Sequence, residues 1–131
     1  MKLKSVLAIL TGCLVSLCLA FGQGAPMRQA TPSAADMAKL TKLEKEYKSS
    51  QAVLKSRHRD KKAIERFSTI GALYGHESMM SPALPPRVKY RQALHIYREV
   101  LKVDPLNKVA KADSDLIISI YKSMGRPIPK D

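Results

Sequence analysis

Two neighbouring segments, residues 67–74 and 93–100, carry large and small side chains at helical spacing, and they constrain the fold more than any other part of the sequence. Residues three and four positions apart share one face of a helix. Gly71 in the first segment and Ala93 in the second lie among aromatic and aliphatic residues. Because Gly inside a helix costs roughly 1 kcal/mol relative to Ala, Gly71 indicates that a second helix approaches closely. The pattern predicts two packed helices, the second ending before Pro105.

The order of these residues resembles a tetratricopeptide repeat. In that family an aromatic, an aliphatic, a small residue and Tyr on a first helix precede small, aromatic and small residues on a second helix, which a Pro closes. The resemblance extends over about residues 64–107. The positions that define it here are Phe67, Ile70, Gly71, Tyr74, Ala93, Tyr97, Val100 and Pro105.

The sequence departs from this family between the two helices. The segment 76–90 is longer than the tight turn of an ordinary repeat, and it contains Pro82, Pro85 and Pro86. We therefore interpret residues 76–86 as an insertion in the connection of the helical hairpin.

Further helices are predicted on both sides of this pair. Ser33 is a candidate N-cap for a first helix, Asp60 for the helix that carries Phe67, and Asn107 for a last helix. The apolar stripe expected on the first helix consists of Met37, Leu40, Leu43, Tyr47 and Leu54. The stripe expected on the last helix consists of Val109, Leu116, Ile117, Ile120, Tyr121 and Met124. The last helix is expected to cover the apolar side of the repeat.

These elements predict an all-α fold of about four helices in antiparallel hairpins, similar to tetratricopeptide repeats. The helical domain is expected at residues 34–126. A flexible leader at 23–33 would precede it, because that segment has too little apolar area to offset the entropy of ordering. Residues 127–131 form a short C-terminal tail, since Pro127 stops the last helix.

Residues 1–22 have the composition of a signal peptide. Lys2 and Lys4 give a positive start, residues 6–21 are uncharged and rich in Leu, and small residues surround Gly22. The expectation is export of the protein to the periplasm or to the exterior.

Two alternatives stay open for the same segment. Cys13 follows a Leu-Thr-Gly sequence similar to a bacterial lipobox, which would make the chain a lipoprotein. Alternatively, residues 5–21 could remain as a membrane anchor, although they are just short of the spanning length of about 20 residues. Cys13 and Cys18 are the two cysteines of the chain, so a mature chain beginning at Gln23 has no thiol for disulfides or metal sites.

The chain is basic, with 23 Lys and Arg against 11 Asp and Glu, and its densest charge lies between the first two predicted helices. This predicted basic patch consists of Lys55, Arg57, Arg59, Lys61 and Lys62. It is either a solvated corner or a surface for an anionic polymer, a lipid surface or nucleic acid. No aromatic residue is interleaved for base stacking, which makes nucleic acid the least favoured target.

No catalytic or cofactor motif is recognisable. His58, His76 and His95 show no metal-ligand spacing, and the sequence has no Gly-rich phosphate loop and no hydrolase or metalloprotease signature. We therefore expect a protein that is not an enzyme and that uses no cofactor and no metal.

The resemblance to tetratricopeptide repeats implies binding of a protein or peptide partner. Carried over by position, the partner groove would be lined by Glu65, Ser68, Ala72, Gly75 and His76. The predicted function is thus an exported module for protein–protein interaction in the bacterial cell envelope, with a partner that the sequence does not identify. The alternative is a basic module that binds an anionic polymer, lipid or nucleic acid through the basic patch.

The signal-peptide interpretation predicts the mass of the native protein. We expect mass spectrometry to give a chain that begins at Gln23, because a signal peptidase cleaves after small residues. An intact Met1 would instead support the retained anchor, and an acylated Cys13 the lipoprotein.

Overall fold

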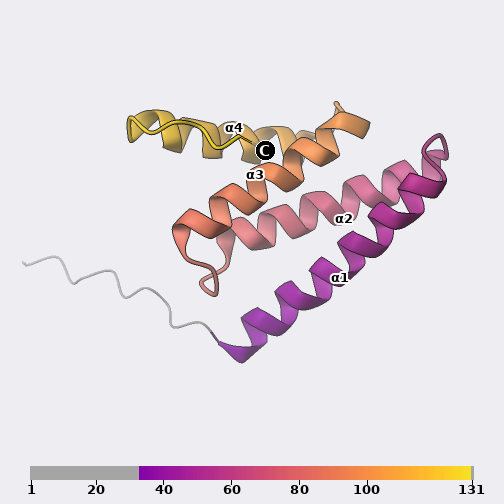
Figure 1. Cartoon of the computed structure of the whole chain (residues 1–131), viewed down its shortest axis with the longest axis horizontal. Coiled ribbons are helices and arrows are strands. Elements are labelled where there is room, and N and C mark those ends of the chain that lie inside the picture. Colours follow the sequence, from indigo (N-terminus) through magenta and orange to yellow (C-terminus); the bar gives the residue numbers. More distant parts are fainter. Residues whose placement is uncertain (1–32, 131) are drawn as a thin grey trace, which may run out of the picture.

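The computed structural model describes residues 33–130, which form four α-helices and no β-strand (Figure 1). Their bounds are α1 Ala34–Ser56, α2 Lys61–Met80, α3 Pro86–Val103 and α4 Lys108–Ser123. The all-α fold of packed helical hairpins predicted from the sequence is confirmed. The predicted signal segment and nearly all of the leader lie outside the described residues. No helix among residues 33–130 combines the length and apolar content that crossing a membrane requires.

Side-chain caps set the beginnings of α1, α2 and α4, as predicted. The Ser33 hydroxyl accepts a hydrogen bond from the Asp36 amide at 3.1 Å, and the Asp36 carboxylate accepts one from the Ser33 amide at 3.1 Å. Asp60 accepts from the amide two residues ahead at 2.9 Å, and Asn107 from the amide three residues ahead at 3.0 Å. Each cap satisfies a backbone donor that has no partner inside its helix.

A Schellman motif ends α4. Gly125 has a φ of 62°, a conformation that Gly adopts without the steric penalty of a Cβ. Its amide donates to the Lys122 carbonyl at 3.0 Å, and the Arg126 amide donates to the Tyr121 carbonyl at 3.0 Å. The chain leaves α4 at this turn and continues as the C-terminal tail.

The connection between α2 and α3 is shorter than predicted. Helix α2 continues to Met80 and α3 begins at Pro86, so residues 76–80 of the predicted insertion are helical and only residues 81–85 connect the two helices. No proline lies within α2, and the side chain of Met79 is buried in the core, so packing extends the helix. The prediction of an inserted loop at 76–86 is therefore wrong, because the additional residues mainly lengthen the helices.

Helix α2 is the centre of the fold, with α1 and α3 packed against it and α4 packed against α3 (Figure 1). The Tyr47 ring of α1 lies 5.4 Å from the Phe67 ring and 5.5 Å from the Tyr74 ring, measured between centroids. The buried apolar residues of α3 and α4 complete this core, and they are Ala93, Leu94, Ile96, Tyr97, Val100, Ala110 and Ile117.

Two glycines of α2 allow this close packing. A Cβ added to Gly71 would lie 2.5 Å from Val100 Cγ2 and 3.3 Å from Tyr47 Cε2. A Cβ added to Gly75 would lie 2.5 Å from Tyr97 Cε1. Since real Cβ atoms do not approach other atoms so closely, α3 could not occupy its position if either residue had a side chain.

The apolar face predicted for the last helix is only partly correct. Ile117 is fully buried, but Val109, Leu116 and Met124 are about half exposed, at 49%, 50% and 50%. The side of α4 that faces the core carries Ala110, Ser114 and Ile117, because small residues there let the helix approach α3. Helix α4 thus covers α3 with a narrower face than predicted. On the first helix, Met37 is likewise exposed at 48%.

The close contact of α2 and α3 predicts a large effect of bulky substitutions. We expect Gly71→Leu and Ala93→Leu each to destabilise the protein by about 1–3 kcal/mol, because neither site has space for a larger side chain. Ala52→Leu is the control, since Ala52 is an exposed residue within α1. Chemical denaturation measures all three, and equal stabilities would contradict the close packing of the two helices.

Candidate functional site

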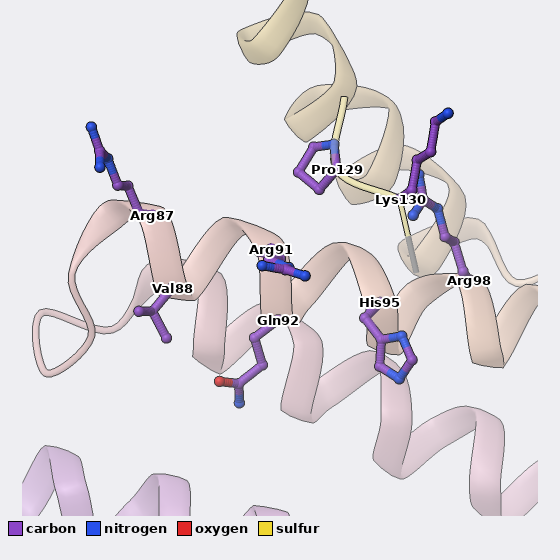
Figure 2. Close-up of a pocket in the computed structure, with 8 residues that line it drawn as sticks. All are labelled: Arg87, Val88, Arg91, Gln92, His95, Arg98, Pro129 and Lys130. Atoms are coloured by element: carbon purple, nitrogen blue, oxygen red, sulfur yellow. The ribbon is translucent and has the colours of Figure 1, made fainter. Parts of the chain in front are cut away.

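A groove with a volume of about 560 Å³ lies between the outer face of α3 and the C-terminal tail, and we call it the cationic groove (Figure 2). The residues that line it are Arg87, Val88, Arg91, Gln92, His95, Arg98, Pro129 and Lys130. Four of these side chains are cationic, those of Arg87, Arg91, Arg98 and Lys130, and none is a carboxylate. The groove is therefore a site of strong positive potential.

The helical period of α3 aligns its basic residues. Arg87, Arg91, His95 and Arg98 follow one another at intervals of four, four and three residues, so they lie on one face. The opposite face carries the fully buried Ala93 and Tyr97. Burial of that face against α2 consequently turns the basic residues outward, and Arg87 and Arg91 are exposed.

The C-terminal tail supplies the second wall of the groove. After the turn at Gly125, Pro127 and Pro129 restrict the backbone, and the partly buried Ile128 between them packs against the core. The tail therefore runs back to α3, where Figure 2 shows Pro129 and Lys130 beside Arg91 and Arg98.

A second groove, of about 280 Å³, lies between α1 and α3 above α2, and we call it the interhelical groove. The residues that line it are Glu44, Tyr47, Lys48, Tyr74, Gln92, His95 and Ile96. Gln92 and His95 also line the cationic groove, so the two grooves meet along these residues of α3.

The interhelical groove contains polar groups above an aromatic floor. The Gln92 amide donates to the Tyr74 hydroxyl at 2.6 Å. The Tyr47 hydroxyl is buried and has no hydrogen-bond partner among the described residues. Burial, together with the nearby negative charge of Glu99, raises the pKa of Tyr47 to about 12. Burial also raises the pKa of Tyr74, with the charge of Glu44 contributing.

A cluster of three side chains ties α2, α3 and α4 together. The carboxylate of Asp113 accepts a hydrogen bond from the Tyr97 hydroxyl at 2.8 Å and lies 2.9 Å from His76 Nδ1. Burial, followed by this hydrogen bond, raises the pKa of Tyr97. Since Tyr97 fills the core beside Gly75, this cluster serves packing. Among residues 33–130, no group of three or more His, Cys, Asp or Glu is arranged to hold a metal ion.

The residues predicted to line a partner groove do not form one. Ser68, Ala72 and Gly75 are buried, whereas Glu65 and His76 are exposed. Because α2 is central and contacts α1, α3 and α4, the face that carries the first three residues is covered by neighbouring helices. The assignment of Ser68, Ala72 and Gly75 to an open groove is therefore corrected, since they are packing residues.

The five residues of the predicted basic patch lie where the sequence indicated, at the corner between α1 and α2, and all five side chains are exposed. None of them lines the cationic groove. The two basic surfaces are thus lined by different residues, and the corner is at the opposite end of α2 from the beginning of α3 (Figure 1).

The cationic groove was not predicted from the sequence, because its basic residues are separated along the chain and form no run of adjacent charges. The signal that could have found it is the helical spacing of Arg87, Arg91 and Arg98 opposite the apolar stripe of α3. The contribution of Lys130 has no such signal, because it depends on the path of the tail.

In comparisons with protein-family models, curated proteins and solved structures, nothing matches this chain.

The burial of Tyr47 predicts a loss of stability at alkaline pH. The ordinary pKa of a Tyr is 10.0, and in the folded protein that of Tyr47 is about 12. The neutral hydroxyl therefore contributes stability that is present below pH 10 and is lost as the pH rises toward 12. We expect Tyr47→Phe to lose less stability than the unmodified chain over this interval in urea denaturation. A Tyr90→Phe variant is the matched control at a partly exposed position, and an unchanged slope in Tyr47→Phe would contradict the assignment.

Proposed function

We propose that the chain is a non-enzymatic binding module that holds an acidic segment of a partner protein in the cationic groove. The observation that carries this proposal is the presence of Arg87, Arg91, Arg98 and Lys130 in the lining of one groove, a lining that contains no carboxylate. An acidic ligand would meet charge-assisted hydrogen bonds there, and Arg can offer two parallel donors to one carboxylate.

The spacing of the arginines fits an extended peptide. Arg87 and Arg91 are four residues apart in α3, which corresponds to about 6 Å along the helix axis. In an extended chain, alternate side chains point to the same side and are roughly 6.6 Å apart. Asp or Glu at alternate positions of a partner segment would therefore face successive arginines.

The lining of the groove favours a peptide over other polyanions. Single-stranded nucleic acid is held by aromatic side chains on which bases stack, and the groove contains no Phe, Tyr or Trp. A lipid surface would contact a flat or protruding basic face, whereas these cations line a concave surface. An acidic peptide needs only the charges and the shape that are present.

The second candidate function is adhesion to an anionic polymer or lipid surface through the basic patch at the α1–α2 corner. The observation that favours it is the exposure of all five cations on one corner. Such a patch would act through long-range attraction that salt weakens, with little selectivity between anionic targets.

The proposal also includes a relationship to tetratricopeptide repeats and a location outside the cytoplasm. A relationship to tetratricopeptide repeats is supported by Gly71 and Ala93 at the contact of α2 and α3. Action outside the cytoplasm is supported by the composition of residues 1–22. We accordingly place the partner among proteins of the bacterial cell envelope.

Charge reversal in the cationic groove tests the proposal. We expect Arg87→Glu/Arg91→Glu to weaken binding of a fluorescent peptide of alternating Glu and Ser by more than tenfold in anisotropy titrations. The reason is that two charge-assisted contacts become repulsive. A peptide with Gln in place of Glu should not bind.

The matched control is Arg57→Glu/Arg59→Glu in the basic patch, which lowers the net charge from +12 to +8 as the first variant does, since each substitution removes two charges. We expect the control to change affinity less than threefold. Equal losses in both variants would indicate non-specific attraction and overturn the assignment to the groove. A larger loss in the control would support the second candidate.

A further inference from the structure

We infer that the end of the helical bundle that carries the basic patch docks on an anionic lipid bilayer, with the side chain of Leu106 as its apolar contact. This membrane site rests on the second candidate function, for which it names the target and adds an apolar anchor. It does not depend on the acidic-peptide site in the cationic groove.

The α1–α2 corner and the turn between α3 and α4, residues 104–107, lie at the same end of the bundle (Figure 1). Val100 of α3 lies at Gly71 of α2. Further along α2, Gly75 meets Tyr97, so the two helices run antiparallel. The end of α3 therefore lies beside the first turns of α2, which begin at the basic patch.

The α3–α4 turn presents Leu106 to solvent on an ordered backbone. The Leu106 side chain is 88% exposed, the highest value among the large hydrophobic residues of the described chain. The Asn107 amide donates to the Asp104 carbonyl at 3.1 Å, and the Asn107 side chain donates to the Asp104 carboxylate at 3.2 Å. Pro105 restricts the backbone between them. The exposure of Leu106 is thus built into the turn and does not come from a frayed helix end.

The basic patch supplies the charge that an anionic membrane attracts. Its five cations are exposed, and the segment that contains them, residues 55–62, has one acidic residue, Asp60. Clusters of Lys and Arg of this size bind anionic lipid headgroups. Near the α3–α4 turn, by contrast, Lys111 is paired with Asp115 at 3.1 Å. The corner therefore provides the electrostatic attraction and the turn provides the apolar contact.

The apolar contact favours a bilayer over an anionic polymer in solution. Burying Leu106 among acyl chains removes apolar surface from water, and this gain adds to the attraction of the headgroups. Since one weak signal gives only marginal membrane binding, a basic patch and an apolar anchor at the same end reinforce each other. A soluble polyanion has no apolar phase, so Leu106 would contribute nothing to its binding.

A single Trp tests whether Leu106 enters the bilayer, because the chain has no Trp of its own. We expect the fluorescence of Leu106→Trp to shift to shorter wavelength on vesicles of equal parts phosphatidylcholine and phosphatidylglycerol. It should lose more than half of its intensity when the acyl chains carry bromine. Met80→Trp is the matched control, since Met80 is 63% exposed at the opposite end of α2, and its emission should change little. Equal changes in both variants, or none in either, would overturn the inference.

Two further variants separate the charge from the apolar contact in titrations with the same vesicles. We expect Arg57→Glu/Arg59→Glu to lose more than tenfold in affinity, and Leu106→Ser to lose at least fivefold. Arg87→Glu/Arg91→Glu, which changes the net charge equally, should lose less than threefold. Equal losses in the two charge variants would indicate general attraction and overturn the assignment to this end of the bundle.

Polyphosphate in solution distinguishes a membrane from an anionic polymer. All variants are made in the full chain, so residues 1–32 contribute equally to each. We expect Leu106→Ser to weaken binding to vesicles and to leave the affinity for polyphosphate unchanged. If the basic patch binds both targets and Leu106→Ser changes neither affinity, the second candidate function stands and the lipid assignment is wrong. If neither target binds, the second candidate function is wrong as well.

Discussion

The packing of α3 on the two glycines of α2 is the contact on which the rest of the structure depends. Val100 occupies the space that a side chain at Gly71 would need, and the ring of Tyr97 occupies the space at Gly75. These contacts fix both the distance and the rotation of α3 relative to α2. Because the rotation is fixed, the residues on the far side of α3 must face solvent, and those residues are the arginines of the cationic groove.

The same contact positions α4 and the tail. Tyr97 reaches past Gly75, and its hydroxyl donates to Asp113 of α4. Asp113 also contacts His76, so the polar end of one core side chain connects three helices. From α4, the turn at Gly125 and the anchored Ile128 direct the tail back to α3. The second wall of the groove is thus a consequence of core packing followed by a specific helix end.

The sequence predicted the elements whose causes are local, and it failed where the cause is tertiary. Caps at Asp60 and Asn107 act on their own helices, and both were identified. The burial of Ser68 and Ala72 depends on which face of α2 its neighbours cover, and helical periodicity alone does not determine that. The prolines of the α2–α3 connection suggested a long loop, but the packing of Met79 extends the helix past the expected end.

Where the charge lies matters more for function than how much there is. A formal charge of +12 attracts every polyanion, and salt screens that attraction within about 10 Å at 0.1 M. The basic patch at the α1–α2 corner adds to this general attraction, since its five side chains are exposed and none of them lines the cationic groove. The cationic groove differs because the helical period of α3 places its basic residues on one face, and the tail adds Lys130 to the lining of the same groove. Because the backbone fixes where these side chains begin, their arrangement can select a ligand by the spacing of its charges.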